Sequence, residues 1–98
     1  MAKLISTGSP FEKTMGYSRA VVKGPWCFVS GVTGYDYATM TIPDDVAGQT
    51  ENCFKTINWA LEQGGFTMVD IVRVQYTVTD AAFVDAIVPV LGAHLGEI

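Results

Sequence analysis

Charge is what this sequence has least of. Only 16% of its 98 residues are charged, and ten acidic residues outnumber six basic ones, giving a formal net charge of −4. The basic residues are scattered rather than clustered, at Lys3, Lys13, Arg19, Lys23, Lys55 and Arg73. Nucleic-acid binding depends on grouped lysine and arginine side chains that neutralise phosphates. The sequence therefore predicts that this protein does not bind nucleic acid.

Cysteine and histidine are also scarce. The sequence has two cysteines, Cys27 and Cys53, one histidine, His94, and no CxxC motif. A disulfide framework or a tetrahedral zinc site needs more of these residues than the chain offers. We expect both cysteines to be small buried hydrophobic residues, and we expect no metal and no cofactor.

Long hydrophobic runs are missing as well. The opening MAKLISTGSP lacks the apolar centre of a signal peptide, and no run approaches the length needed to cross a membrane. We therefore expect no membrane partner, and a location in the reducing cytoplasm.

Apolar residues, by contrast, are abundant, at 49% of the chain. A chain of 98 residues forms one small domain, so residues 1–98 are interpreted as a single unit with a modest core. The surplus of apolar side chains would leave apolar surface in need of a partner. The composition therefore predicts a homo-oligomer.

The first half of the chain indicates strands. Residues 3–6 suit a short strand, and residues 7–14, which hold Gly, Ser and Pro, suit a loop. Residues 18–23 and 26–32 are rich in β-branched and aromatic side chains and flank a Lys-Gly-Pro turn. They predict a β-hairpin.

The second half alternates between helix and strand. Residues 44–63 carry an apolar stripe at helical spacing, with Asp44 and Asp45 at the start and two glycines after the end. Residues 71–79 alternate apolar and polar side chains, which predicts a strand with one apolar face. A last helix would follow Asp80, kinked or shortened by Pro89. The order predicts an α+β fold with both helices on one face of a sheet.

One stretch, GYSRAVVKGPWCFVSG from Gly16 to Gly31, combines several polar groups with this hairpin. Its second strand ends in Ser30 and Gly31, where a hydroxyl lies beside backbone that other groups can approach closely. Such a pair could form the floor of a site for a small polar ligand. An ordinary hairpin end that needs a glycine explains the same residues.

Four segments in this order, GYSRA, WCFVSG, QTENCFKTINWALEQGG and MVDIVRVQYTVTD, extend the pattern. Together they make the chain similar, from about Ser6 to Asp80, to the Rid/YjgF family. These proteins are reactive imine and enamine deaminases that are often labelled L-PSP endoribonucleases. The resemblance implies a chorismate-mutase-like fold, in which a mixed β-sheet carries two helices on one face. It departs from the family at Met15-Gly16, where Gly-Pro is typical.

The resemblance also implies a function. Family members are homotrimers that bind a small carboxylate metabolite in a cleft between subunits. They hydrolyse 2-imino or enamino acids to 2-keto acids and ammonia. Tyr17, Ser30 and Gly31 match substrate-binding positions of the family. The arginine and glutamate of the family lie beyond residue 98, together with its C-terminal strands, so the catalytic residues are unknown. We expect either a truncated chain or a naturally short variant that recruits the missing strands from elsewhere.

A second interpretation stays open, in which the same fold is a non-catalytic module that binds a small metabolite or serves regulation. Other residues are weaker candidates. Arg19 and Arg73 could hold an anion, but isolated strand arginines are usually solvated. Tyr35 and Tyr37 could border a cleft or merely cover the core.

Overall fold

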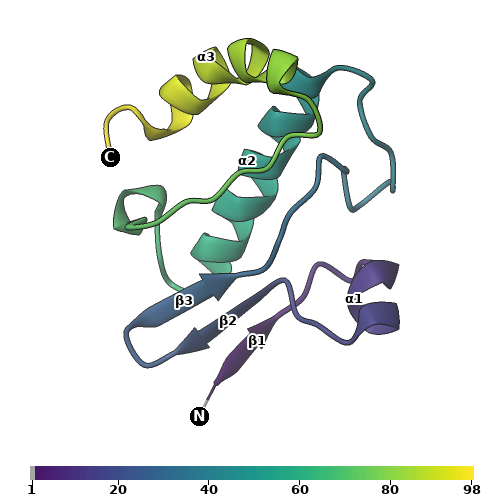
Figure 1. Cartoon of the computed structure of the whole chain (residues 1–98). Helices are drawn as coiled ribbons and strands as arrows, with labels where there is room; N and C mark the ends of the chain where they lie inside the picture. Colours follow the sequence, from purple (N-terminus) through teal and green to yellow (C-terminus); the bar gives the residue numbers. More distant parts are fainter. Residues whose placement is uncertain (1) are drawn as a thin grey trace.

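The structure is a computed structural model that describes residues 2–98, and it contains strands, α-helices and two short 3₁₀ turns (Figure 1). In chain order the elements are β1 (Lys3–Ile5), α1 (Pro10–Met15), β2 (Ala20–Lys23), β3 (Trp26–Val29), α2 (Val46–Gln63), η1 (Met68–Asp70), η2 (Ala81–Phe83) and α3 (Val84–Leu95). The α+β class predicted from the sequence is confirmed.

The strands form an antiparallel sheet in the order β1-β2-β3. In the hairpin, Val21 pairs with Phe28 and Lys23 with Trp26, and Leu4 of β1 lies opposite Val21. Gly24, in the turn, has a φ of 59°, a left-handed conformation that glycine adopts without strain. The hairpin and the first strand are confirmed, although each element is shorter than the sequence indicates.

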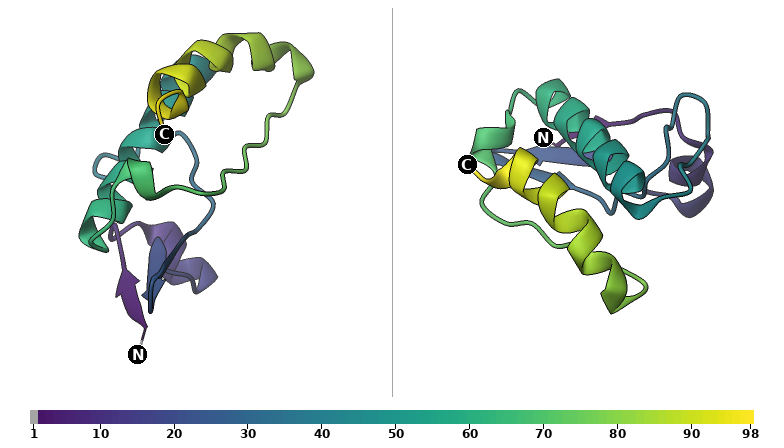
Figure 2. Two further views of the ribbon diagram at one scale, coloured as in Figure 1. Left: turned by 90° about the vertical axis from the view of Figure 1, so that its left-hand side faces the viewer. Right: turned by 90° about the horizontal axis from the view of Figure 1, so that it is seen from above.

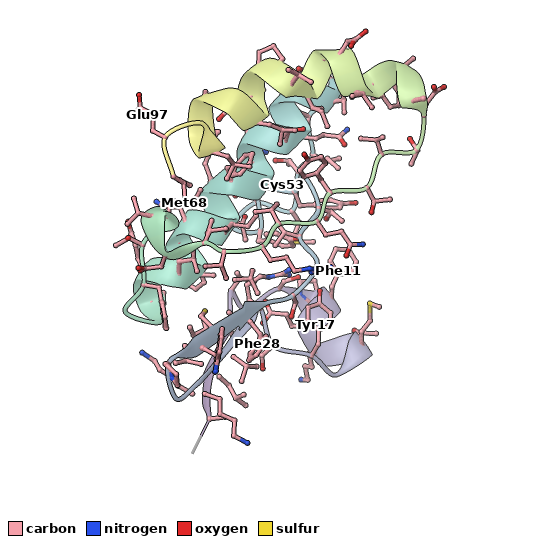
Figure 3. The ribbon with its side chains drawn as sticks, turned by 60° about the vertical axis from the view of Figure 1, so that its left-hand side comes forward. Phe11, Tyr17, Phe28, Cys53, Met68 and Glu97 are labelled. Carbon is pink, nitrogen blue, oxygen red and sulfur yellow. The ribbon has the colours of Figure 1, made fainter. Side chains whose placement is uncertain are left out.

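The two faces of the sheet differ in what covers them. One face carries Ile5 and Ala20, which are buried in a cluster with Ala60 of α2. The opposite face carries Leu4 and Phe28, which are 67% and 62% exposed. Figure 3 shows Phe28 on the side of β3 away from α2. The core therefore lies between the sheet and α2.

The helix α2 begins and ends where the sequence predicts. The Asp45 side chain accepts a hydrogen bond from the Gly48 N–H, and Gly64 donates to carbonyls of the last turn. Gly65, with a φ of 85°, then turns the chain away. Two views show α2 on one side of the sheet and α3 beside α2 on that same side (Figure 2).

The helix α3 is fixed to α2 by apolar and polar contacts. Ile87 is buried, and the His94 ring stacks on Phe54 with centroids 4.3 Å apart while its Nε2 lies 2.9 Å from Glu51 Oε2. The sequence predicts that Pro89 kinks or shortens this helix, and the helix is not shortened there but continues through Pro89 to Leu95. Because Pro89 has no backbone N–H, the carbonyl of Asp85 lacks its usual helical hydrogen bond. Both residues are exposed, so water can bind that carbonyl instead.

The strand predicted over residues 71–79 is wrong for this structure. The segment runs in extended form between η1 and η2 but joins no strand, and its apolar Val72 is 89% exposed (Figures 1 and 2). Alternation specifies which side chains share a face, whereas a strand also needs a backbone partner, and here none is adjacent. The sheet is consequently antiparallel rather than mixed, and the outer edge of β3 is unpaired within residues 2–98.

A second difference lies in residues 7–14, which were predicted to be a loop. The short helix α1 forms there instead, because each end is capped by a suitable residue. The Ser9 hydroxyl accepts a hydrogen bond from the Phe11 N–H, Pro10 opens the first turn, and Gly16 closes the helix with a φ of 74°. Across residues 2–98, every helix is too short or too polar to cross a membrane.

Candidate functional site

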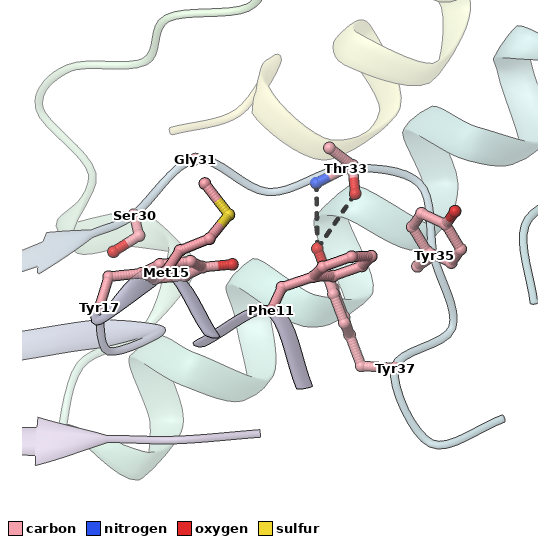
Figure 4. A pocket seen from close by; sticks show the side chains of 8 residues that line it. All are labelled: Phe11, Met15, Tyr17, Ser30, Gly31, Thr33, Tyr35 and Tyr37. Carbon is pink, nitrogen blue, oxygen red and sulfur yellow. Dashed lines mark hydrogen bonds between the residues drawn. The ribbon is translucent and has the colours of Figure 1, made fainter. Parts of the chain in front are cut away.

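A cavity of about 640 Å³ opens between α1 and the chain that leaves β3 (Figure 4). Most of its lining is aromatic or otherwise apolar, with hydroxyl groups interspersed. The lining residues are Phe11, Met15, Tyr17, Ser30, Gly31, Thr33, Tyr35 and Tyr37. Concave, mostly apolar pockets with a few polar groups are the usual form of a small-molecule site.

Ser30 is placed by an extension of the β2–β3 pairing. Its N–H donates to the Arg19 carbonyl at 3.0 Å, and its hydroxyl donates to the Ser18 carbonyl at 2.6 Å. The hydroxyl hydrogen is thus engaged within the protein. The oxygen keeps lone pairs that can accept from a ligand.

Tyr17 is placed by the end of α1. Its N–H donates to the Glu12 carbonyl at 3.0 Å, directly after the left-handed Gly16. Its phenol oxygen accepts a hydrogen bond from Arg19 Nη2 at 3.3 Å. Since arginine only donates, the phenol hydrogen of Tyr17 remains available to a ligand.

Arg19 is the polar residue that organises this region. Its side chain is fully buried, so the expectation that Arg19 is solvated is wrong. Nη1 donates to the Gly31 carbonyl at 2.9 Å, and the guanidinium lies 4.4 Å from the centroid of the Tyr37 ring and 5.4 Å from that of Tyr17. Cation–π contact and hydrogen bonding offset part of the cost of burying the charge.

Glu12 supplies the negative charge opposite Arg19. Its Oε2 lies 3.9 Å from Arg19 Nη2 and accepts hydrogen bonds from the backbone N–H and the hydroxyl of Thr7. Burial raises the pKa of the Glu12 carboxyl, but the Thr7 and Ser6 hydrogen bonds and the charge of Arg19 outweigh it, so the pKa is lowered overall. Glu12 is therefore an ionised counter-ion at neutral pH.

The outer wall of the pocket is aromatic. Phe11 and Tyr35 meet edge to face with centroids 5.7 Å apart, and the Tyr37 hydroxyl accepts a hydrogen bond from the Thr33 N–H at 3.2 Å (Figure 4). Tyr35 and Tyr37 thus border the cleft. Sequence reasoning missed Phe11 and Thr33 as lining residues, because α1 was interpreted as a loop. The Ser-Pro start and Gly end of α1 were the signal that could have revealed it.

The three predicted site residues, Tyr17, Ser30 and Gly31, come together in this one pocket. Their role in binding stays a prediction. Arg73, the other arginine considered, lies on the exposed extended segment and donates to Gln75 instead.

Among residues 2–98, the lining of this pocket contains no histidine, carboxylate, lysine or cysteine, and its ionisable side chains are tyrosines. The part of the chain that the structure describes also contains no group of three or more metal-ligating side chains. The two cysteines are free and half-buried, and burial raises the pKa of both thiols, so neither resembles an activated nucleophile. The pocket as built can bind and orient a ligand through its hydroxyl groups.

Comparison with known proteins identifies the family of this chain. The model of the family described as endoribonuclease L-PSP matches residues 7–98. The chain belongs to this family, which is the YjgF or Rid family. The resemblance inferred from the sequence is therefore confirmed.

Solved structures agree with that assignment. A Mycobacterium tuberculosis member of the YjgF/YER057c/UK114 family is 37% identical and superimposes with a TM-score of 0.88 over 99% of this chain and 76% of its own. A putative endoribonuclease from Thermotoga maritima is 28% identical, with a TM-score of 0.80 over 97% of this chain and 71% of its own.

An uncharacterised protein of Streptomyces coelicolor is 28% identical over 83 residues. The match covers 85% of this chain but only 62% of that relative. The chain thus spans about three fifths of the curated relative that it matches.

Proposed function

We propose that this protein binds a small 2-imino or enamino acid and promotes its hydrolysis to a 2-keto acid and ammonia. Water adds to the imine carbon to form a carbon–oxygen bond, and the carbon–nitrogen bond then breaks with release of ammonia. The observation that carries the proposal is the pocket, in which Tyr17, Ser30 and Gly31 line a cavity large enough for a small metabolite.

Electrostatics around the pocket suit an anionic ligand. The lining itself carries no charge, and the buried Arg19 lies directly behind Tyr17 and Gly31. A carboxylate held by the Tyr17 hydroxyl would therefore have a guanidinium nearby in a region shielded from water, where electrostatic attraction is stronger. The Glu12 carboxylate, with Oε2 3.9 Å from Arg19 Nη2, offsets part of that attraction.

In this proposal, the side chains that activate water are supplied from outside the 98 residues of this chain. Because the pocket lining offers no carboxylate, imidazole or amine that could activate water at neutral pH, the 98-residue chain by itself should bind ligand without turning it over. The site would be completed by a neighbouring subunit in a homotrimer or by further chain. Apolar side chains at the rim support a covering partner, since Met15 is 72% exposed and Phe11 is partly exposed.

The same observation favours a second function, that of a non-catalytic module that binds a small metabolite. A turnover assay on the protein in its native assembly separates the two. An L-amino acid oxidase would generate the imine, and semicarbazide would trap what remains. Faster loss of the imine in the presence of this protein supports hydrolysis, whereas ligand binding without any such acceleration supports the binding module.

Ribonuclease activity, which the family description suggests, receives no support from this chain. The pocket lining contains no lysine, arginine or histidine, and the net charge is −4. We keep the prediction that RNA is not a partner. A cytoplasmic location likewise remains an expectation.

Two substitutions at the end of β3 test the pocket itself. Gly31 lies next to open space, since a Cβ added there would meet no atom within 4 Å, so the larger side chain of Gly31→Val would project into the cavity. We expect Gly31→Val to weaken binding of 2-oxobutanoate, measured by NMR titration, whereas Ser30→Ala should not weaken it, because the Ser30 hydroxyl donates to the Ser18 carbonyl and not to the ligand. Equal affinities for both variants and the unmodified chain would show that the ligand binds elsewhere.

A further inference from the structure

Two of the hydroxyl groups that line the pocket, those of Ser30 and Tyr17, are held in opposite hydrogen-bonding states. Ser30 Oγ donates its hydrogen to the Ser18 carbonyl at 2.6 Å, so it can only accept from a ligand. The Tyr17 oxygen accepts from Arg19 Nη2 at 3.3 Å, so its own hydrogen is free to donate. Neither state follows from the residue types, since an isolated hydroxyl can act both ways.

The partners that set these states are themselves fixed. Arg19 is fully buried and is held by the Gly31 carbonyl and by the rings of Tyr17 and Tyr37. Ser18 directly precedes Arg19, and the backbone pairing of Ser30 N–H with the Arg19 carbonyl holds the Ser18 carbonyl in reach. The end of the hairpin therefore determines that Tyr17 donates to a ligand and that Ser30 accepts from it.

We propose that this pocket selects ligands that present a hydrogen-bond acceptor to Tyr17 and an N–H donor to Ser30. The proposal rests on the proposed function and names its substrate class more closely. A 2-imino or enamino acid has both features, a carboxylate oxygen and a neighbouring N–H. The 2-keto acid formed from it has the carboxylate but replaces the N–H by a carbonyl oxygen, whose lone pairs would face those of Ser30.

The consequence is discrimination between substrate and product within one pocket of one shape. An N–H group gains a hydrogen bond with Ser30, whereas a carbonyl oxygen leaves Ser30 unsatisfied and opposes two acceptors. Hydrolysis would thus convert a ligand that fits the pocket into one that it holds more weakly. This helps the product to leave.

Two stable ring compounds isolate this effect. Pyrrole-2-carboxylate and furan-2-carboxylate have nearly the same shape and the same charge, but the first has a ring N–H where the second has a ring oxygen. Their dissociation constants would be measured by NMR titration on the 98-residue chain, a method that tolerates weak binding. We expect the pyrrole to bind about twofold to twelvefold more tightly, the range of one neutral hydrogen bond.

Three variants assign that preference to particular atoms. Ser30→Ala should bring the ratio of the two dissociation constants close to one, and Ser30→Thr, which keeps the hydroxyl, should retain the preference. Tyr17→Phe should weaken both ligands and leave the ratio unchanged. Because both ligands are compared on the same sample, a partly unfolded variant changes both constants equally and not their ratio.

The outcomes separate the two proposals. Equal binding of the two rings, tighter binding of the furan, or a preference that survives Ser30→Ala would overturn the polarity of the pocket and leave a carboxylate-binding function standing. Binding of neither ring would overturn the proposed function and this inference with it.

Discussion

Arg19 and Glu12 show how two charged side chains become buried in a protein with little charge. Both lie below 6% exposure, 3.9 Å apart at their nearest nitrogen and oxygen. Glu12 Oε1 and Arg19 Nε have no hydrogen-bond partner among the described residues, so the pair is incompletely satisfied. A buried pair of this kind contributes little as a whole, yet removing one member is costly because the other charge is left uncompensated.

Arg19→Met should therefore lower the free energy of unfolding by about 3–5 kcal/mol. The additional change Glu12→Gln should recover part of this loss, because it removes the unpaired carboxylate. Urea denaturation of both variants measures the effect. Arg73→Met is the matched control, since Arg73 is exposed, and it should cost less than about 0.5 kcal/mol. An equally small cost for Arg19→Met would contradict this account of the buried pair.

Glu12 also predicts a pH dependence. Its pKa is lowered in the folded protein relative to an ordinary value of 4.5, so the folded state favours the ionised form. The stability that this contributes is fully present above pH 4.5 and is lost as the pH falls through the lowered pKa. Denaturation at a series of pH values should show the difference between the unmodified protein and Glu12→Gln shrinking below pH 4.5. A difference that stays constant would contradict it.

At the scale of elements, the loop that follows β3 connects the sheet to α2 through hydrogen bonds. The Gly34 carbonyl accepts a hydrogen bond from Asn52 Nδ2 at 3.1 Å, and the Cys53 thiol contacts the Val32 carbonyl. Gly34 is buried against Gln49, so closely that an added Cβ would lie 2.6 Å from the Gln49 Cα. This contact fixes the loop that places Tyr35 and Tyr37 in the lining of the pocket.

Gly34→Ala should destabilise the protein by about 1–3 kcal/mol, because the new methyl group would force the loop away from α2. Gly31→Ala is the matched control, since a Cβ there meets no atom within 4 Å. The melting temperatures of the two variants, measured side by side, check this. A lower melting temperature for Gly31→Ala than for Gly34→Ala would contradict it.

The extended segment over residues 71–78 lacks the backbone partners of a strand. We therefore expect its amide hydrogens to exchange rapidly in this chain, in contrast to those of Ala20–Lys23, which lie in the central strand of the sheet. Hydrogen–deuterium exchange followed by NMR measures both segments in one sample. Protection of residues 71–78 as strong as that of β2 would show that they pair with another strand in solution.

At the scale of the whole molecule, apolar surface remains uncovered. Leu4, Val21 and Phe28 form one row across the outer face of the sheet through their strand register, and Trp26 lies on the same face. Leu4, Trp26 and Phe28 are each more than half exposed. An apolar sheet face of this kind supports self-association, in agreement with the excess of apolar residues in the composition.

Phe28→Lys should weaken the proposed homotrimer, because it places a charge in the centre of this row. Sedimentation equilibrium at micromolar concentration should give a trimer for the unmodified protein and a lower mass for the variant. Val72→Lys is the control, since Val72 is exposed but lies on the extended segment rather than on the sheet. A monomer in the absence of any substitution would contradict the proposed assembly.

The sequence by itself determined the elements whose signals are local. Asp45 and Gly64 mark the ends of α2, and the Lys-Gly-Pro turn marks the hairpin, because capping and turn formation involve residues close together in the chain. The alternation over 71–79 gave the extended conformation but not the pairing.

Only the tertiary structure decided what depends on distant residues. Strand pairing requires a partner beside the segment, and residues 71–79 have none here. Burial of Arg19 required a counter-ion from α1, carbonyl oxygen from the end of β3 and an aromatic ring from the following loop. The hydrogen-bonding states of Tyr17 and Ser30 follow from those same contacts, because a hydroxyl takes the role that its fixed neighbours leave to it.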